Sequence, residues 1–398
     1  MSSYNISVIR KRYQMLTEQD SILISSVRFP LAVMVVAIHA FIPISGWDYY
    51  SVSMQGAGSN IAAFSMIALS HVFCHIAVPT FFLISGFLFF ANFANGGRII
   101  WRKKIIGRTK SLLIPYILWI CIYVLYLVVL DYRDVFELGL LDWIKGRGGL
   151  SVFWCSNKWN LSRIDLWGNP AVSSSPILVP FWFMRNLLVC ICFTPLYWYI
   201  FQKDSGKVLR IIGIITLSIL YLSQTSLIIP GFSSSSFFYF GIGSLLGLNE
   251  RSLCLEASKF KMLGYVSFGV LFLAEICLDG HNTYIGNLIY PFFVVSGVVS
   301  IINIVSYKKR VWGGQKYTFF IFAFHIFILP VVGILLEKVI SWITGFQTVN
   351  DIEFANRFPY LLMLEYVAII LTTIALTMGI YIVIDKILPR TCKLLCGR

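Results

Sequence analysis

The sequence predicts an all-α, polytopic membrane protein with about ten transmembrane helices and both termini in the cytoplasm. Three observations predict this class. Of the 398 residues, 58% are hydrophobic and only 13% are charged, and the mean hydropathy of +0.79 is far above that of water-soluble globular proteins. The apolar residues are gathered into long runs. Positive charges are concentrated in alternate breaks between those runs.

The apolar runs define the predicted spans, since crossing the hydrocarbon core takes about 20 mostly apolar residues per helix. Ten runs are separated by charged or Gly-, Pro- and Ser-rich breaks. They lie near residues 22–44, 61–91, 111–130, 178–201, 208–226, 236–249, 262–279, 284–305, 318–340 and 360–384. The second run is long enough to be tilted or kinked, and Pro79 provides a cause for a kink.

The Lys and Arg residues between the runs predict the orientation. With a cytoplasmic N-terminus, the inside segments hold 22 of them and the outside loops hold 6. The excess behind the net charge of +14 therefore lies in cytoplasmic loops, and nucleic-acid binding is not needed to explain it. We expect a cytoplasmic segment at 1–21, a membrane domain at 22–384 with an outside loop at about 131–177, and a cytoplasmic tail at 385–398.

Arg28 and His39 are ionisable residues inside the first run. Eleven residues at 100° each make three turns plus about 20°, so on a straight helix the two side chains share a face about 16 Å apart along the axis. An Arg near the boundary can simply extend to the interface, and a buried His can be satisfied by a neighbouring helix. Ionisable residues in spans nevertheless tend to face a bundle interior or an aqueous cavity. The pair therefore fits a phosphate-bearing cofactor such as coenzyme A, which enters from the cytoplasm and carries its thioester deep into the membrane.

Five stretches in a fixed order carry a resemblance to a known family. They are Arg28 and His39 with ten residues between them, VPTFFLISGF with Ser85, WRKKIIGRTKSLLIPYILW, FWFMRNLLV with Trp182 and Arg185, and YTFFIFAFHIFILP with His325. Together they resemble acyltransferase family 3, the integral-membrane O-acyltransferases that modify bacterial cell-surface glycans. The resemblance runs from about residue 22 to residue 384. The family's closely spaced Arg-x-x-Arg is matched only loosely, and no soluble transferase domain follows the membrane part.

The resemblance implies transfer of an acyl group, most simply acetyl, from cytoplasmic acyl-CoA to a sugar hydroxyl. The acceptor would be a cell-surface glycan or lipid-linked saccharide on the outer side of the bacterial inner membrane. His39 is the expected catalytic residue, either as general base or as a nucleophile that is itself acylated. Acetyl-CoA or another acyl-CoA is the expected co-substrate, with membrane lipid as surroundings. Neither a metal nor a nucleic-acid partner is expected.

The remaining expected site residues fall into two groups. The basic segment and Arg28 are expected to hold the coenzyme phosphates, although the positive-inside rule alone would put cations in that segment. Its members are Arg102, Lys103, Lys104, Arg108 and Lys110. Substrate contact or structural support is expected of Ser85, Trp182, Arg185, His325 and Glu365.

Several of these residues have competing interpretations. Arg185 would hold an anionic acceptor, stabilise an oxyanion or pair with an acid such as Glu365, and structural pairing is favoured. His325 would assist binding or hydrogen-bond to a neighbouring helix. Ser85 stands in a Ser-Gly-Phe segment without a GxSxG elbow, which favours close helix approach over a nucleophile.

Two further alternatives concern the whole chain and a histidine pair. A secondary transporter or glycan flippase is the alternative function, because many spans and scattered intramembrane charges are ordinary there. An inactive relative that serves as an assembly partner is the third interpretation. His71 and His75 are four residues apart, a spacing that suits metal ligands, but no third ligand accompanies them.

Overall fold

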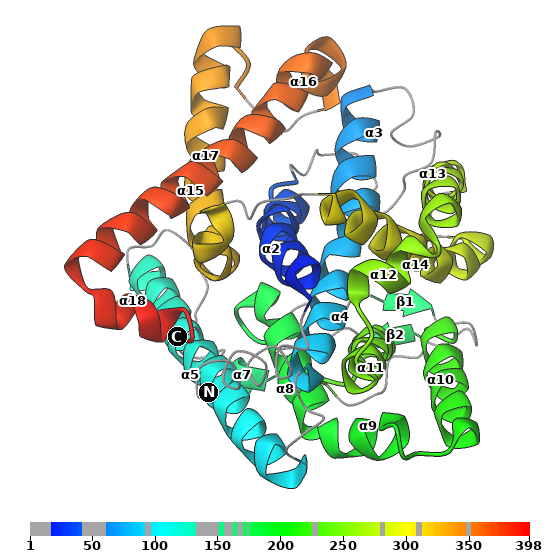
Figure 1. Ribbon diagram of the computed structural model, residues 1–398. Coiled ribbons are helices and arrows are strands. Elements are labelled where there is room, and N and C mark those ends of the chain that lie inside the picture. Colours follow the sequence, from blue (N-terminus) through cyan, green and yellow to red (C-terminus); the bar gives the residue numbers. More distant parts are fainter. Residues whose placement is uncertain are drawn as a thin grey trace.

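A computed structural model describes residues 17–41, 61–91, 97–132, 151–154, 162–164, 170–172, 175–224, 230–278, 283–307, 313–347 and 352–398. Within these residues the chain forms a bundle of helices with one small antiparallel hairpin (Figure 1). The helices that coincide with the predicted runs are α2 (Glu18–His39), α3 (Ile61–Ile67) with η1 (Ala68–Val72), η2 (Phe73–Ile76) and α4 (Ala77–Phe90), α5 (Gly97–Tyr132), α8 (Trp182–Cys192) with α9 (Thr194–Phe201), α10 (Lys207–Leu222), α11 (Ser234–Leu248), α13 (Lys261–Cys277), α14 (Tyr284–Ser306), α15 (Thr318–Thr344) and α17 (Pro359–Ile387).

Shorter elements connect these helices. They are α7 (Ser151–Trp154), η3 (Val179–Phe181), α12 (Leu253–Ser258), η5 (Gly313–Tyr317), α16 (Ile352–Arg357) and α18 (Pro389–Leu395), together with the paired strands β1 (Ser162–Ile164) and β2 (Pro170–Val172). The prediction of an all-α protein is therefore right apart from this hairpin, which falls in the expected outside loop.

Six described helices, or continuous helical segments, are long and apolar enough to cross a membrane. They are Glu18–His39, Ile61–Phe90, Trp101–Leu130, Tyr284–Ser306, Gly313–Thr344 and Pro359–Ile387. The pair α8 and α9 is bent by 54° and makes a seventh if its halves form one span. The helices α10, α11 and α13 have only 16, 15 and 17 residues. Each predicted run thus coincides with helix, while the number of ten spans and the location of the termini stay predictions.

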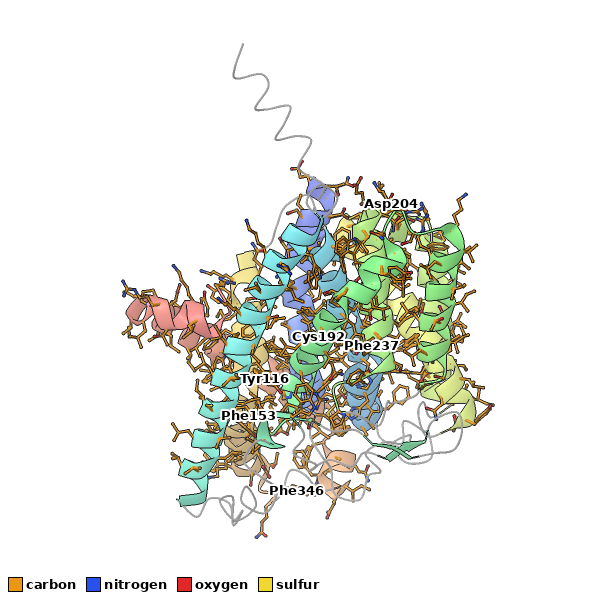
Figure 2. The ribbon with its side chains drawn as sticks, turned by 90° about the horizontal axis from the view of Figure 1, so that it is seen from below. Tyr116, Phe153, Cys192, Asp204, Phe237 and Phe346 are labelled. Carbon is orange, nitrogen blue, oxygen red and sulfur yellow. The ribbon has the colours of Figure 1, made fainter. Side chains whose placement is uncertain are left out.

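Two segments predicted on the same side of the membrane, those before α10 and after α11, meet at one end of the bundle. Lys203, before α10, pairs with Glu250, after α11, at 2.9 Å. Figure 2 shows Asp204 at this end and Phe346, from a predicted outside segment, at the opposite end. The side of the membrane on which each end lies stays a prediction.

The second run is distorted where Pro79 predicts a distortion. Its α-helical start passes into the π-helical turn η1 and the 3-10 turn η2 before α4 begins at Ala77. Proline lacks an amide hydrogen, and its ring crowds the carbonyl four residues earlier, here that of His75. The irregular segment carries His71 and His75, and π-helical turns are frequent at functional sites.

Glycines let α4 and α11 approach until their backbones touch. A Cβ atom on Gly86 would lie 2.1 Å from the carbonyl oxygen of Phe240, and one on Gly243 would lie 2.0 Å from that of Leu83. Small residues at helix interfaces allow such close approach in membranes. The expectation that the Ser-Gly-Phe segment serves helix packing is thereby confirmed at Gly86.

One face of α13 carries a row of exposed apolar side chains. Each is between 60% and 69% exposed, and they recur at helical spacing: Met262, Leu263, Val266, Val270 and Leu273. A face of this kind suits hydrocarbon rather than water. Lipid is therefore the expected surroundings of the bundle.

Candidate functional site

The helix α2 positions both ionisable residues of the first run. It begins after Thr17, whose hydroxyl accepts a 3.0 Å hydrogen bond from the amide of Asp20, and it continues to His39. Arg28 and His39 are half-buried, while Val27 and Leu31 are completely buried. The helix is continuous over these residues, with Pro30 inside it, and the rise of about 16 Å between Arg28 and His39 stays a prediction for a straight helix.

His39 lies beside His325 of α15. Their ring centroids are 5.3 Å apart and the planes are tilted by 34°. His325 is 0% exposed, and its Nδ1 lies 3.0 Å from the carbonyl oxygen of Ile321. Its Nε2 is buried, and no described residue forms a hydrogen bond with it. The structure therefore brings together two histidines that the sequence separates by most of the chain.

Two further histidines from the distorted segment lie in the same region. His71 interacts electrostatically with His39, and its ring centroid is 6.4 Å from that of His75. His71 Nδ1 lies 2.6 Å from the Ser70 hydroxyl, and His75 Nδ1 lies 3.3 Å from the Tyr290 hydroxyl. The pair considered as metal ligands is thus engaged with hydroxyl groups. The sequence pattern did not associate His71 with His39.

A cluster of three arginines lies along α2 toward its other end. The charge of Arg28 lies close enough to those of Arg108 on α5 and Arg398 after α18 for them to repel one another. Among the described residues, the ion pairs lie elsewhere and leave these three guanidinium groups without a carboxylate. We call these residues the arginine cluster. Cations gathered without an acid partner favour a polyanionic ligand.

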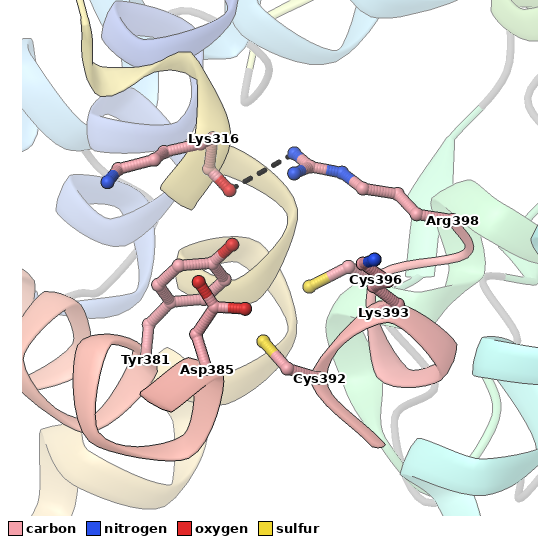
Figure 3. A pocket seen from close by; sticks show the side chains of 7 residues that line it. All are labelled: Lys316, Tyr381, Asp385, Cys392, Lys393, Cys396 and Arg398. Atoms are coloured by element: carbon pink, nitrogen blue, oxygen red, sulfur yellow. Dashed lines mark hydrogen bonds between the residues drawn. The ribbon is translucent and has the colours of Figure 1, made fainter. Parts of the chain in front are cut away.

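A cavity of about 240 Å³ adjoins the arginine cluster (Figure 3). It is lined by Lys316, Tyr381, Asp385, Cys392, Lys393, Cys396 and Arg398. The Arg398 guanidinium donates a 3.2 Å hydrogen bond to the carbonyl oxygen of Lys316. Burial raises the pKa of the Cys396 thiol to about 12, so this thiol is neutral. Three cations against the single carboxylate of Asp385 leave the cavity positive.

The segment that carries Arg398 is fixed by packing against α5. The indole of Trp119 donates a 2.9 Å hydrogen bond to the carbonyl oxygen of Leu395. Gly397 has a φ of 67°, and a Cβ atom there would lie 2.1 Å from the carbonyl oxygen of Ser111. Sequence reasoning missed Arg398, because a cation in a tail that is predicted to be cytoplasmic carries no signal of its own. The preceding glycine is the only hint of a tight turn.

The cations of the basic segment that was expected to bind phosphate make different contacts. Arg108 joins the arginine cluster. The Lys104 ammonium donates hydrogen bonds to the carbonyl oxygens of Phe89, at 2.8 Å, and Ala91. These carbonyls end α4, where a cation also interacts favourably with the helix dipole. The other three members, Arg102, Lys103 and Lys110, are exposed, as is Arg108.

Arg185 is 3% exposed and fixes a piece of the outside loop. Its guanidinium donates to the carbonyl oxygen of Trp154 at 2.5 Å and to Oδ1 of Asn186 at 3.1 and 3.3 Å. Glu365 is buried beside Glu337 instead. The suggested partnership of Arg185 with Glu365 is therefore wrong, because the backbone of α7 supplies the acceptor. A structural role for Arg185 is nevertheless what these contacts indicate.

The two remaining expected residues lie on helices around α4. Ser85 is half-buried beside the close approach at Gly86. The half-buried Trp182 has its ring centroid 6.5 Å from that of Phe82, at the start of α8. Neither residue contacts His39 through a hydrogen bond described by the structure.

Comparison with known proteins identifies the family. Residues 24–382 match the family model for the acyltransferase domain of acyltransferase family 3. No curated protein and no solved structure matches the chain significantly. The matched residues include α2 with both of its ionisable side chains and nearly all of the helices long enough to cross a membrane. The chain therefore belongs to acyltransferase family 3 and is a membrane acyltransferase.

Proposed function

We propose that the protein is an O-acyltransferase, in the simplest case an O-acetyltransferase, of a bacterial inner membrane. It moves an acyl group from cytoplasmic acyl-CoA to a hydroxyl of a cell-surface glycan or lipid-linked saccharide on the outer side. One observation carries the proposal. The single helix α2 presents Arg28 within a cluster of unpaired cations and presents His39 about three turns further on.

The donor would bind with its nucleotide at the arginine cluster. Guanidinium groups form paired, charge-assisted hydrogen bonds with phosphate, and coenzyme A is a group carrier with several phosphates at one end and a thioester at the other. Arg28, Arg108 and Arg398 would hold the phosphates, and Lys316 and Lys393 of the adjoining cavity would add positive charge. The pantetheine arm would then follow α2 toward His39.

The chemistry at His39 would be proton transfer coupled to acyl transfer. The imidazole takes the proton of the acceptor hydroxyl while the hydroxyl oxygen bonds to the thioester carbonyl carbon. The carbon–sulfur bond then breaks, and the imidazolium returns the proton to the thiolate, so that the products are the O-acyl ester and free coenzyme A. In the alternative route, an imidazole nitrogen of His39 bonds to the acyl carbon, the carbon–sulfur bond breaks, and the thiolate takes the proton of the ring. The hydroxyl oxygen then bonds to the acyl carbon, the carbon–nitrogen bond breaks, and the imidazole takes the hydroxyl proton.

Label transfer in a reconstituted membrane tests the proposal. Purified protein in vesicles receives acetyl-CoA labelled in the acetyl group on one side and a candidate glycan on the other. We expect label on the glycan with the wild type, at least a hundredfold less with His39→Ala, and a raised KM for acetyl-CoA with Arg28→Ala. Glycan that crosses the vesicle wall without gaining label would instead support a transporter and contradict the proposal.

A matched cation variant controls for general charge effects. Arg251 is an exposed arginine after α11 that pairs with Glu256 at 3.3 Å and does not belong to the arginine cluster. We expect Arg251→Ala to leave the KM for acetyl-CoA within about twofold, because an exposed ion pair contributes little. An equal effect of Arg28→Ala and Arg251→Ala would contradict phosphate binding at Arg28.

A further inference from the structure

His325 is held in one tautomer by the backbone of its own helix. Its Nδ1 lies 3.0 Å from the carbonyl oxygen of Ile321, four residues earlier on α15. A carbonyl oxygen only accepts hydrogen bonds, so Nδ1 must carry the hydrogen. In the neutral ring, Nε2 is then a bare acceptor.

The Nε2 atom of His325 is a buried acceptor. His325 is 0% exposed, and within the part of the chain that the structure describes, Nε2 has no hydrogen-bond partner. A buried polar atom without a hydrogen-bond partner lowers the free energy of unfolding. An unsatisfied atom of this kind in a native structure therefore indicates a functional role or a partner that binds there. The ring of His39 lies beside it, with its centroid 5.3 Å away at a tilt of 34°.

We infer that His325 is a positioning residue. Its Nε2 accepts a hydrogen bond from His39 when His39 takes up the proton of the sugar hydroxyl. This role rests on the proposed function of His39. A neutral imidazole has one N–H group, whereas the imidazolium has two and needs a second acceptor. This hydrogen bond requires a rotation of the His39 ring that places one of its nitrogens at the usual N–H to acceptor distance of about 2.7–3.2 Å. His325 keeps its own proton on Nδ1 throughout, so no proton leaves the pair until the thiolate receives it.

The arrangement follows the general logic of an acid–base pair that a third group orients, with an imidazole in the place of the usual carboxylate. The buried carboxyl of Glu365 does not supply this group, since it lies beside Glu337. Among the described residues, the titratable groups at this end of α2 include His71 on η1, Cys74 on η2 and Tyr366 on α17, whose hydroxyl donates to the carbonyl of Ala37. A neutral acceptor stabilises the imidazolium without adding a buried charge.

Three substitutions at His325 distinguish the hydrogen-bond acceptor role of Nε2 from the other roles of the side chain. His325→Gln can keep an acceptor oxygen near the position of Nε2. His325→Asn can keep a donor near Nδ1 but has no atom at Nε2, and His325→Phe keeps only the packing. We expect the asparagine and phenylalanine variants to lose about 10- to 100-fold in kcat, with the KM for acetyl-CoA within about twofold, and glutamine to retain most of the activity. Equal loss with glutamine and asparagine overturns the inference.

A matched control uses the same substitution at a histidine of the neighbouring segment. His75 lies one turn beyond His71 and contacts Tyr290. We expect His75→Asn to leave kcat within about threefold. A loss of kcat in His75→Asn equal to that in His325→Asn would show a general sensitivity of the bundle and overturn the assignment.

A second readout does not depend on acyl transfer. In ¹⁵N-histidine NMR of the protein in nanodiscs, with His39→Gln and His325→Asn used to assign signals, we expect His325 in the Nδ1–H tautomer. We also expect the His39 nitrogens to shift between wild type and His325→Asn, but not between wild type and His75→Asn. An unchanged His39 signal in His325→Asn overturns the inference, even if label transfer is normal. If the wild type transfers no label, the proposed function is contradicted. The NMR comparison then still tests the hydrogen bond between His39 and His325.

Discussion

The hydroxyl of Tyr366 on α17 donates a 2.8 Å hydrogen bond to the carbonyl oxygen of Ala37, two residues before His39. The last carbonyls of a helix have no partner within the helix, so Tyr366 satisfies one of them from a neighbouring helix. The turn that carries His39 is therefore held in place by a residue from the far end of the sequence.

Removal of this hydroxyl should impair catalysis more than binding. We expect Tyr366→Phe to lower kcat about three- to tenfold, because one hydrogen bond of about 1 kcal/mol no longer orders the last turn of α2. Steady-state label transfer measures kcat and the KM for acetyl-CoA. Tyr197→Phe is the control, since its hydroxyl donates a similar buried bond, 3.1 Å to the carbonyl of Phe237, away from His39. An unchanged kcat in Tyr366→Phe would contradict the prediction.

Arg398 should contribute to donor affinity. We expect Arg398→Ala to raise the KM for acetyl-CoA about five- to twentyfold with little change in kcat, since one charge-assisted phosphate contact is lost. The loss should shrink at high salt, which screens the exposed part of the interaction. Arg390→Ala removes an exposed arginine from α18 of the same tail and should leave KM unchanged. Equal KM values for Arg398→Ala and wild type would exclude Arg398 from the donor site.

The contact between α4 and α11 should not tolerate a methyl group. We expect Gly243→Ala to destabilise the protein by about 1–3 kcal/mol, because the added Cβ would lie 2.0 Å from the Leu83 carbonyl and the helices must separate. Thermal unfolding of purified protein in detergent measures the change. Gly379→Ala is the control, since nothing lies within 4 Å of a Cβ there. Equal melting temperatures of the two variants would argue against the close approach.

Lys104 should act on stability rather than on donor binding. We expect Lys104→Met to destabilise the protein by about 1–2 kcal/mol, because the final carbonyls of α4 lose their donor. The KM for acetyl-CoA should stay within about twofold. Lys103→Met changes the exposed neighbour and should alter neither quantity. A large rise in the KM for acetyl-CoA without loss of stability would indicate that Lys104 binds the donor.

The sequence predicted the helical elements well because hydrophobic run length is a local signal. Each of the ten runs coincides with a helix or bent pair of helices, and the distortion near Pro79 follows from the missing amide of proline. The hairpin β1–β2 was missed, since three-residue strands carry no readable alternation. The short helices α10, α11 and α13 show why a run by itself does not decide whether a helix spans.

Residue spacing along one helix was also sufficient to relate Arg28 to His39. Both lie on the uninterrupted α2, as the helical repeat predicts. The prediction that Arg185 pairs with an acid such as Glu365 was wrong. Whether Arg185 contacts Glu365 or the backbone of α7 depends on how distant segments pack.

By itself, the sequence determined the membrane class, the helical runs, the family and the helix that carries Arg28 and His39, all of which follow from local composition and spacing. Only the tertiary structure decided which side chains from other helices meet this helix: His325 beside His39, Tyr366 under its last turn, and Arg108 and Arg398 around Arg28. Such contacts join residues far apart in the chain. They depend on how the helices pack in three dimensions, which periodicity along one helix does not encode.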